Sequence, residues 1–350
     1  MKNKKIQDQL ITYGIVIAAY IIMEILIKTG NLSSHMKGLL VPMTYYAVIA
    51  VALNLCVGIL GELSIGHCGF MCIGAFFSAF FSKVTENILP TAPRFFLAFV
   101  IGIAFAALFG FLIGIPVLRL NGDYLAIVTL AFGEIIKNVI NAIYLGIDSK
   151  GIHMSLKSSM DLNLEPGGEI IINGAMGITG TPHDSNFTIA VVVLLLSLFV
   201  VLNLINSRDG RAIMAVRDNS IAAESTGINV TGYKMMAFTI SAAFAGAAGV
   251  LFSHNITSLT AASQYFGYNA SIMILVYVVL GGIGNIRGSV IAAVILYMLP
   301  ELLRGLNNDR MLIYAVVLIV MMIFNWSPGV IDTRKKLLAR FRKGGSHGTT

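Results

Sequence analysis

The sequence predicts an all-α, polytopic integral membrane protein, and two observations carry that prediction. Hydrophobic residues make up 57% of the 350-residue chain, while charged residues make up only 12%, about half the share of a soluble domain. Ten apolar runs approach the length of about 20 residues that a helix needs to cross a bilayer. We therefore expect one transmembrane domain over residues 1–350, without an attached soluble domain, which disfavours a receptor or scaffold.

The ten expected spans differ in how regular they are. The third, eighth and ninth are short or interrupted by glycine, so each is either a full span or a broken or re-entrant helix. The first follows three lysines, as a signal peptide does, but it lacks a small-x-small cleavage site and is expected to be retained. The spans cover residues 10–27, 38–60, 64–82, 94–117, 122–141, 187–206, 235–254, 269–284, 288–304 and 311–326.

The distribution of Lys and Arg predicts the orientation. With ten crossings and a cytoplasmic N-terminus, 15 of these residues face inside and 8 face outside, which is the usual bias. We therefore expect both termini, the hydrophilic segment 207–233 and the basic tail 327–350 to be cytoplasmic. The loop 142–186 is then extracytoplasmic. Its Gly, Asn, Ser and Asp content is typical of turns, and its length fits either a lid or docking surface or a disordered connector.

Enzyme and nucleic-acid functions find little support in the sequence. It contains no G-x-x-x-x-G-K-[ST], H-E-x-x-H or G-x-S-x-G motif, so we expect no catalytic residues, no metal and no cofactor bound by this chain. If ATP drives its activity, the ATPase is a separate polypeptide. The net charge of +7 is scattered over loops and the tail, so no nucleic-acid partner is expected. Cys56, Cys68 and Cys72 lie in or beside apolar runs, which predicts buried, reduced thiols.

A glycine-rich stretch joins the second and third spans, LNLCVGILGELSIGHCGFMCIGAF at 53–76. Glycines permit close helix contact or a break in a helix, and breaks at membrane depth often build substrate sites. Gly61, Ser64 and His67 are therefore candidate pathway residues. The stretch serves either substrate contact or tight packing, with Glu62 at the cytoplasmic interface.

A later stretch partly repeats this pattern. Residues 58–64, GILGELS, parallel residues 281–287, GGIGNIR, in the order of glycine, apolar and polar positions. The match indicates either two structural repeats or a chance similarity between glycine-rich segments. Gly284, which corresponds to Gly61, is the candidate broken-helix residue of the second stretch.

The span 122–141 carries charged residues, which are costly in a bilayer and usually point into a bundle or cavity. Asp123 and Glu134 are eleven residues apart, about three helical turns, so they share a face and are candidate pathway residues of the protein interior. Other interpretations remain open. Asp123 could cap the helix, and Glu134 could pair with Lys137 at i,i+3.

The segment 207–233, SRDGRAIMAVRDNSIAAESTGINVTGY, is basic, rich in Ala and compatible with a short helix between two spans. Asp218 followed by Asn219 and Ser220 offers the chemistry of a helix start, and Gly227 offers that of a helix end. Small residues would allow close approach to a soluble partner. The segment is either a site that receives force from such a partner or an ordinary cytoplasmic loop.

Five of these pieces together resemble the membrane permease subunits of ABC importers for branched-chain amino acids. The resemblance extends from about residue 40 to 330, and the 122–135 piece is similar to the LivM type of subunit rather than the LivH type. The pieces are GELSIGHCGF (61–70), LRLNGDYLAIVTLAFGEIIKNVI (118–140), NGAMGITGTP (173–182), GRAIMAVRDNSIAAESTGINV (210–230) and VLGGIGNIRGSVIAA (279–293).

The resemblance implies the site residues of the hydrophilic segment. The coupling motif of ABC importers, Glu-Ala-Ala-x-x-x-Gly, is matched by residues 221–227, with Ile221 in place of the first Glu. That departure makes this motif less specific when it is taken alone. The residues implied to contact the ATPase are Arg211, Arg217, Asp218, Ala222, Ala223 and Gly227.

The resemblance also implies the assembly. The chain would sit in the bacterial inner membrane with a LivH-like second permease subunit, two ATP-binding cassette subunits that use ATP and an extracytoplasmic amino-acid-binding protein. An importer of the same architecture for urea or short amides remains an alternative. A proton- or sodium-coupled carrier with ion sites at Asp123, Glu134 and His67 is a second one.

Overall fold

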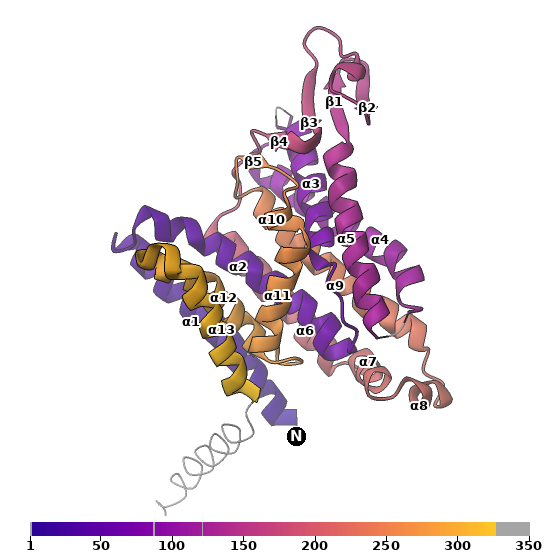
Figure 1. Ribbon diagram of the computed structural model, residues 1–350, viewed down its shortest axis with the longest axis vertical. Helices are drawn as coiled ribbons and strands as arrows, with labels where there is room; N and C mark the ends of the chain where they lie inside the picture. Colours follow the sequence, from indigo (N-terminus) through magenta and orange to yellow (C-terminus); the bar gives the residue numbers. More distant parts are fainter. Residues whose placement is uncertain (1, 87, 121, 327–350) are drawn as a thin grey trace, which may run out of the picture. The chain divides into compact units, whose positions relative to one another are not determined.

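Helices make up most of the protein, in agreement with the predicted all-α class (Figure 1). The computed structural model describes residues 2–86, 88–120 and 122–326. The chain divides into two compact units, residues 1–294 and 295–350. The predicted basic tail 327–350 lies outside the described residues.

Within the described residues, nine helical segments are long and apolar enough to cross a membrane. The expected tenth span is α13, whose apolar stretch Leu312–Ile323 is shorter than the others. The helices are α1 (Lys2–Lys28), α2 (Ser34–Asn54), α3 (His67–Val84), α4 (Thr91–Val117), α5 (Asp123–Ala142), α6 (Phe187–Asn206), α7 (Arg208–Asp218), α8 (Ser220–Ser225), α9 (Val230–Ser253), α10 (Ser263–Phe266), α11 (Tyr268–Gly281), α12 (Ile286–Leu302) and α13 (Arg310–Trp326).

The core of the first unit is the packing of α3 and α4 on α9. Small residues meet at these crossings, as when Gly74 of α3 faces Gly246 of α9. A Cβ atom at Gly74 would lie 2.3 Å from the Gly246 carbonyl oxygen, so no larger residue fits without moving a backbone. Helices in a bilayer associate through such close packing because lipid is as apolar as their side chains. Cys56, Cys68 and Cys72 are buried here as predicted.

The predicted break after the second span is present. The α2 helix continues as a π-helix over Leu55–Leu60 and ends at Gly61, whose φ of +83° is in the left-handed region that favours glycine. Residues 61–66 form no helix, and α3 begins only at His67. The backbone N–H of Ile65 donates to the Thr129 hydroxyl of α5 at 3.1 Å. The Thr129 side chain thus accepts a hydrogen bond from a backbone amide that no helix satisfies. Within a bilayer, such an amide needs a partner in the protein.

A second break separates α11 from α12, and it lies against the first. Gly284 has φ +81°, close to the value at Gly61, and a Cβ atom on Gly58 would lie 2.3 Å from the Gly284 nitrogen. The fully buried Asn54 joins the two segments. Its Oδ1 accepts from Gly284 N–H at 2.8 Å, and its Nδ2 donates to Ser289 Oγ at 2.6 Å. The two glycine-rich stretches therefore lie against each other. Their origin as structural repeats stays a prediction.

The loop 142–186 contains β-strands that the composition did not predict. Strands β1 (Tyr144–Asp148), β2 (Gly151–Ser155) and β3 (Glu169–Asn173) form an antiparallel sheet in the order β2-β1-β3, and β4 (Ile178–Thr179) pairs with β5 (Ser258–Leu259). The strands are at most five residues long, so their alternation is too brief to stand out from the turn residues.

Asp148 explains why the first hairpin forms. Its Oδ1 accepts from the N–H groups of Lys150 and Gly151 at 2.8 and 3.2 Å, which closes the turn between β1 and β2. Its Oδ2 lies 3.0 Å from His153 Nε2. Burial opposes ionisation of Asp148, but the backbone N–H groups of Lys150 and Glu165 and the His153 ring outweigh it. The pKa of Asp148 is therefore lowered from its ordinary value.

The sheet and α7–α8 lie at opposite ends of the first unit (Figure 1). The connectivity agrees, because α6 begins after the sheet and ends at α7. A buried ion pair fixes the sheet end to the helices, since Arg94 at the start of α4 binds Asp184 at 2.8 Å. Residues 142–186 thus form an ordered excursion rather than a disordered connector.

Candidate functional site

A polar cleft of about 440 Å³ opens at the α7–α8 end of the first unit. Four segments line it: the break after the π-helix, the start of α5, the α7–α8 junction and the start of α9. Four predicted residues meet there, because Gly61, Asp123, Arg217 and Asp218 all contribute to the lining. The other lining residues are Leu60, Glu62, Leu63, Gly122, Val216, Asn219, Ser220, Ile221 and Lys234.

Arg217 joins the hydrophilic segment to the broken helix. Its Nη1 donates to the Gly58 carbonyl oxygen at 3.0 Å, within the π-helix. Its aliphatic carbons cover Gly61, where an added Cβ would lie 2.4 Å from Arg217 Cγ. Asp218 accepts from Nε and Nη2 of the same guanidinium at 3.0 and 2.8 Å, which orients it. A shift of the last turn of α7 would therefore pull directly on the break.

An ion pair makes a second connection between these parts. Lys234, in the first turns of α9, donates to Glu62 in the break, and the two side chains are only 11% and 13% exposed. Sequence reasoning missed Lys234 and Asn54. Both act across more than 170 residues of chain, and no local pattern shows which partner a residue finds at that distance.

The predicted start and end of the short helix are correct. The Asn219 side chain accepts from Ala222 N–H at 3.0 Å, which caps α8. At the other end, Gly227 has φ +84°, and Ile228 N–H returns to the Ala223 carbonyl at 3.1 Å. A Cβ atom on Gly227 would meet nothing within 4 Å, so this glycine is required by its backbone conformation and not by close packing within this chain.

All of the predicted coupling residues except Ala223 are exposed. Ile221 is 80% exposed, and Ala222 and Arg211 are exposed as well, while Ala223 is 5% exposed and faces its own chain. Arg211 donates to the carbonyl of Asn206, the last residue of α6, at 3.2 Å. The exposed residues of α8 are therefore Ser220, Ile221, Ala222, Glu224 and Ser225.

Ser64 and His67 lie deeper than the cleft, and both are buried. His67 Nε2 is 2.6 Å from Ser241 Oγ, and that hydroxyl donates to the Ala52 carbonyl at 2.5 Å. Since the Ser241 proton is used, Nε2 must carry a hydrogen and donate it. The other nitrogen, Nδ1, lies 3.0 Å from the Ser64 hydroxyl. Both ring nitrogens are hydrogen-bonded, so here these residues hold α3 to α2 and α9.

Asp123 does not belong to the interior, which contradicts the prediction for it. It is the first residue of α5 and exposed, since its helix begins at the mouth of the cleft rather than within the bundle. Glu134, by contrast, is partly buried. It pairs with Lys137 at 2.5 Å and also accepts from the backbone N–H of Tyr268 at 2.8 Å, the first residue of α11. Lys137 also donates to Ser263 at 2.9 Å, so the pair joins α5 to α10 and α11.

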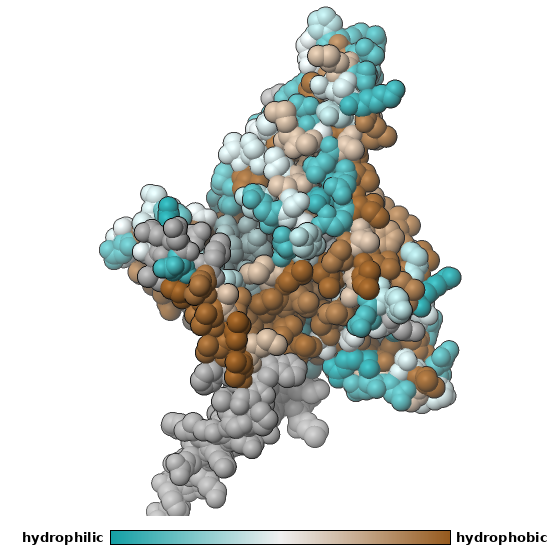
Figure 2. Space-filling view, viewed as in Figure 1, coloured by the Kyte–Doolittle hydropathy of each residue, from teal (hydrophilic) through white to brown (hydrophobic). Residues whose placement is uncertain are grey.

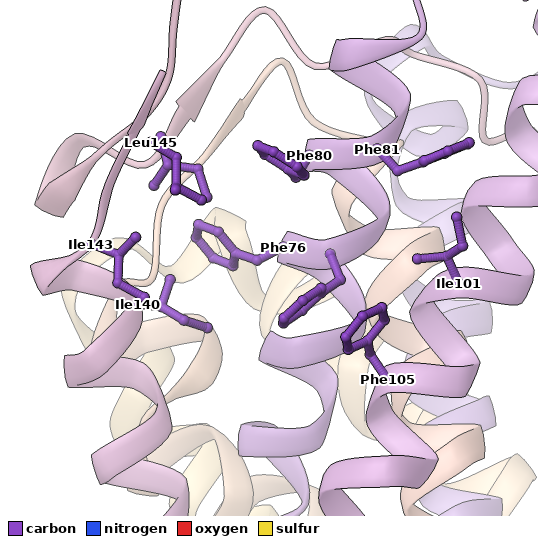
Figure 3. Close-up of a pocket in the computed structure, with 10 residues that line it drawn as sticks. Phe76, Phe80, Phe81, Ile101, Phe105, Ile140, Ile143 and Leu145 are labelled. Atoms are coloured by element: carbon purple, nitrogen blue, oxygen red, sulfur yellow. The ribbon is translucent and has the colours of Figure 1, made fainter. Parts of the chain in front are cut away.

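A second cavity, of about 360 Å³, is an apolar groove near the sheet (Figure 3). Figure 3 shows aromatic rings of α3 and α4 and aliphatic side chains from the end of α5 and the sheet along its walls. Its lining offers no charged or amide side chain to an ammonium or a carboxylate group. The groove thus lacks the groups that an amino acid needs. It is lined by Phe76, Phe77, Phe80, Phe81, Ile101, Phe105, Ile140, Ile143, Leu145 and Ile172.

Comparison with known proteins adds to this geometry. Residues 35–324 match the family model described as "Branched-chain amino acid transport system / permease component". The chain is 36% identical over 296 residues to the high-affinity branched-chain amino acid transport system permease protein LivM of Salmonella typhimurium, and 34% identical over 316 residues to LivM of Escherichia coli. These alignments cover 81% and 87% of this chain.

The chain spans about two thirds of the length of these LivM relatives, 66% and 71% respectively. It is also 24% identical over 293 residues to the permease protein LivH of Salmonella typhimurium. That alignment covers 82% of this chain and 91% of the relative. The match to LivM is thus the stronger one, in agreement with the predicted LivM type of subunit.

Proposed function

Because this chain belongs to the family of permease components of branched-chain amino acid transport systems, we propose that it is one membrane-spanning subunit of an ATP-driven importer for these amino acids. The observation that carries the proposal is the link from the exposed α8 surface, through Arg217, to the broken helix at 58–66. A soluble partner that moves α7–α8 would act directly on an interruption inside the spans.

The assembly follows from what this chain offers and what it lacks. Its sequence has no phosphate-binding loop, so the two ATP-hydrolysing subunits are separate chains that dock on the exposed residues of α8, among them Ile221 and Ala222. The second permease subunit is LivH-like. The sheet end presents the ordered excursion 142–186 to an extracytoplasmic amino-acid-binding protein. Both termini and the segment 207–233 are cytoplasmic, and the membrane is the bacterial inner membrane.

In the proposed transport step, side-chain contacts transmit the movement of the ATPases from α7–α8 to the break. When the ATPases close, α7–α8 shifts, and Arg217 and the Glu62–Lys234 pair carry the shift to the break. Residues 61–66 form no helix, so they can rearrange at lower cost than the spans around them. The break would therefore open and close the path while the α3–α4–α9 core stays packed.

Uptake by the reconstituted system tests this function. Proteoliposomes that hold this chain with its permease, ATPase and binding-protein partners should accumulate labelled leucine, isoleucine and valine only when ATP is inside. Omission of the ATPases should abolish uptake, and an ionophore should leave it unchanged. Preference for urea or acetamide would favour the alternative substrate class. Uptake without the ATPases that an ionophore collapses would indicate an ion-coupled carrier and contradict the proposal.

A further inference from the structure

One face of the first unit exposes polar side chains inside two candidate spans. From α5 it includes Asn138, and from the span Ser263–Gly281 it includes exposed polar residues of α10 and the first turn of α11. Figure 2 shows hydrophilic surface that continues from the sheet over α10 and the neighbouring half of α5. We name this the α5–α11 face, defined by Ile135, Asn138, Gln264, Tyr265, Tyr268 and Asn269.

The outer surface of α4 is different in kind. Between residues 95 and 117, every exposed side chain of this helix is apolar. Leu108 and Phe111, for example, are 49% and 46% exposed. An apolar stripe of this length is what lipid requires of a spanning helix. The α5–α11 face differs from this stripe, because amide and tyrosine side chains are exposed on it beside the aliphatic Ile135.

Lipid is a poor cover for the α5–α11 face. An amide without a hydrogen-bond partner is costly in an apolar medium, and the exposed Asn138 and Asn269 would bring two amide side chains into contact with lipid. The carboxylate of Glu134, which pairs with Lys137 and accepts from the Tyr268 N–H of this face, is 25% exposed. A charge that faces lipid at the centre of a span costs about 2.5–3.5 kcal/mol on insertion scales. Polar side chains at such positions more often bond across helix–helix interfaces.

We propose that the α5–α11 face is where the second permease subunit packs, an inference that rests on the proposed function. The composition fits a protein interface, since two tyrosines and the aliphatic Ile135 are exposed beside the amides. The partner's fold gives a second argument. The LivH relative aligns with 82% of this chain, so a LivH-like partner has the same architecture. Two similar subunits associate most simply about a two-fold axis, which brings the same face of each together.

Cysteine crosslinking of the intact pair tests the assignment. Asn269→Cys or Asn138→Cys would be combined with single cysteines at the aligned positions of the LivH-like subunit, and Leu108→Cys is the matched control on α4. The native Cys56, Cys68 and Cys72 are each 0% exposed and contribute little background. We expect a bismaleimide to convert the Asn269→Cys and Asn138→Cys chains into crosslinked heterodimer and to leave Leu108→Cys monomeric.

A second measurement reports lipid contact directly. With Trp326→Phe to remove the single native tryptophan, Asn269→Trp in the pair should resist quenching by brominated lipid, whereas Leu108→Trp should be quenched. Crosslinking from Leu108→Cys in place of Asn269→Cys, or quenching of Asn269→Trp, would overturn the inference. So would reaction of Asn269→Cys with a soluble maleimide without any crosslink, because the face would then be open to water.

Co-purification of the two subunits distinguishes a wrong assignment of the face from a wrong function. If the pair forms but crosslinks through α4, the proposed function stands and the assigned face is wrong. If the unmodified chain forms no pair with a LivH-like subunit, the proposed function itself fails.

Discussion

At the scale of single residues, Arg217 is the side chain on which coupling should depend most. Arg217→Lys keeps the charge but loses the planar fork that reaches Gly58 and Asp218 together. Hydrogen bonds to charged groups contribute about 1.5–3 kcal/mol, and Arg217 is partly exposed, so we expect about a tenfold loss of uptake. The measurement is uptake per ATP hydrolysed in proteoliposomes, with assembly checked by co-purification.

Arg208→Lys is the control for that substitution. Arg208 is the first residue of the same helix and is exposed, and it does not belong to the residues implied to contact the ATPase. It should keep uptake close to that of the unmodified chain. Equal losses in the two variants would mean that charge on α7 matters and that the contact with the break does not.

At the scale of elements, the Glu134–Lys137 pair should act as a clamp between α5 and α11. Glu134→Gln leaves Lys137, which is 7% exposed, without its counter-charge, and loss of one partner of a buried pair costs about 3–5 kcal/mol. Lys137→Gln should cost less, because Glu134 is more exposed and keeps the Tyr268 N–H. The double change should be more stable than Glu134→Gln alone. Thermal unfolding of the purified complex in detergent measures all three.

Transport by the same variants then separates two roles of the clamp. If the only role of the pair is that each charge neutralises the other, transport by the double variant should exceed that of both single variants. If Glu134 serves the pathway or the subunit interface, the double variant should transport no better than Glu134→Gln. Near-normal transport in all three would remove this pair from the functional site.

At the scale of the whole molecule, the two ends of the first unit should face opposite sides of the membrane. The Lys and Arg count predicts α8 inside and the sheet outside. In intact cells, Ser220→Cys should need a membrane-permeant thiol reagent, whereas Met160→Cys should react with an impermeant one. Both positions are exposed, and Met160 is 88% exposed, so access to reagent is matched. The opposite labelling pattern would reverse the topology.

Much of the fold could be predicted from the sequence because it depends on local chemistry. Apolar length predicts spans, glycine predicts the interruption at Gly61, and Asn219 with Gly227 predicts the start and end of α8. Each depends on a few neighbouring residues. The strands after α5 were missed for the converse reason, since a five-residue strand carries too little alternation to be recognised beside so many turn residues.

The candidate site was less accessible to sequence reasoning, because its contacts join segments far apart in the chain. Composition and pattern determined that this protein spans a membrane, that a helix breaks near Gly61 and that a short capped helix lies between two spans. Only the tertiary structure decided that Arg217 reaches Gly58, that Lys234 pairs with Glu62 and that Asp123 lies outside the bundle. The physical reason is that a local pattern specifies backbone conformation and burial, whereas the partner of a buried polar group is set by how the finished helices cross.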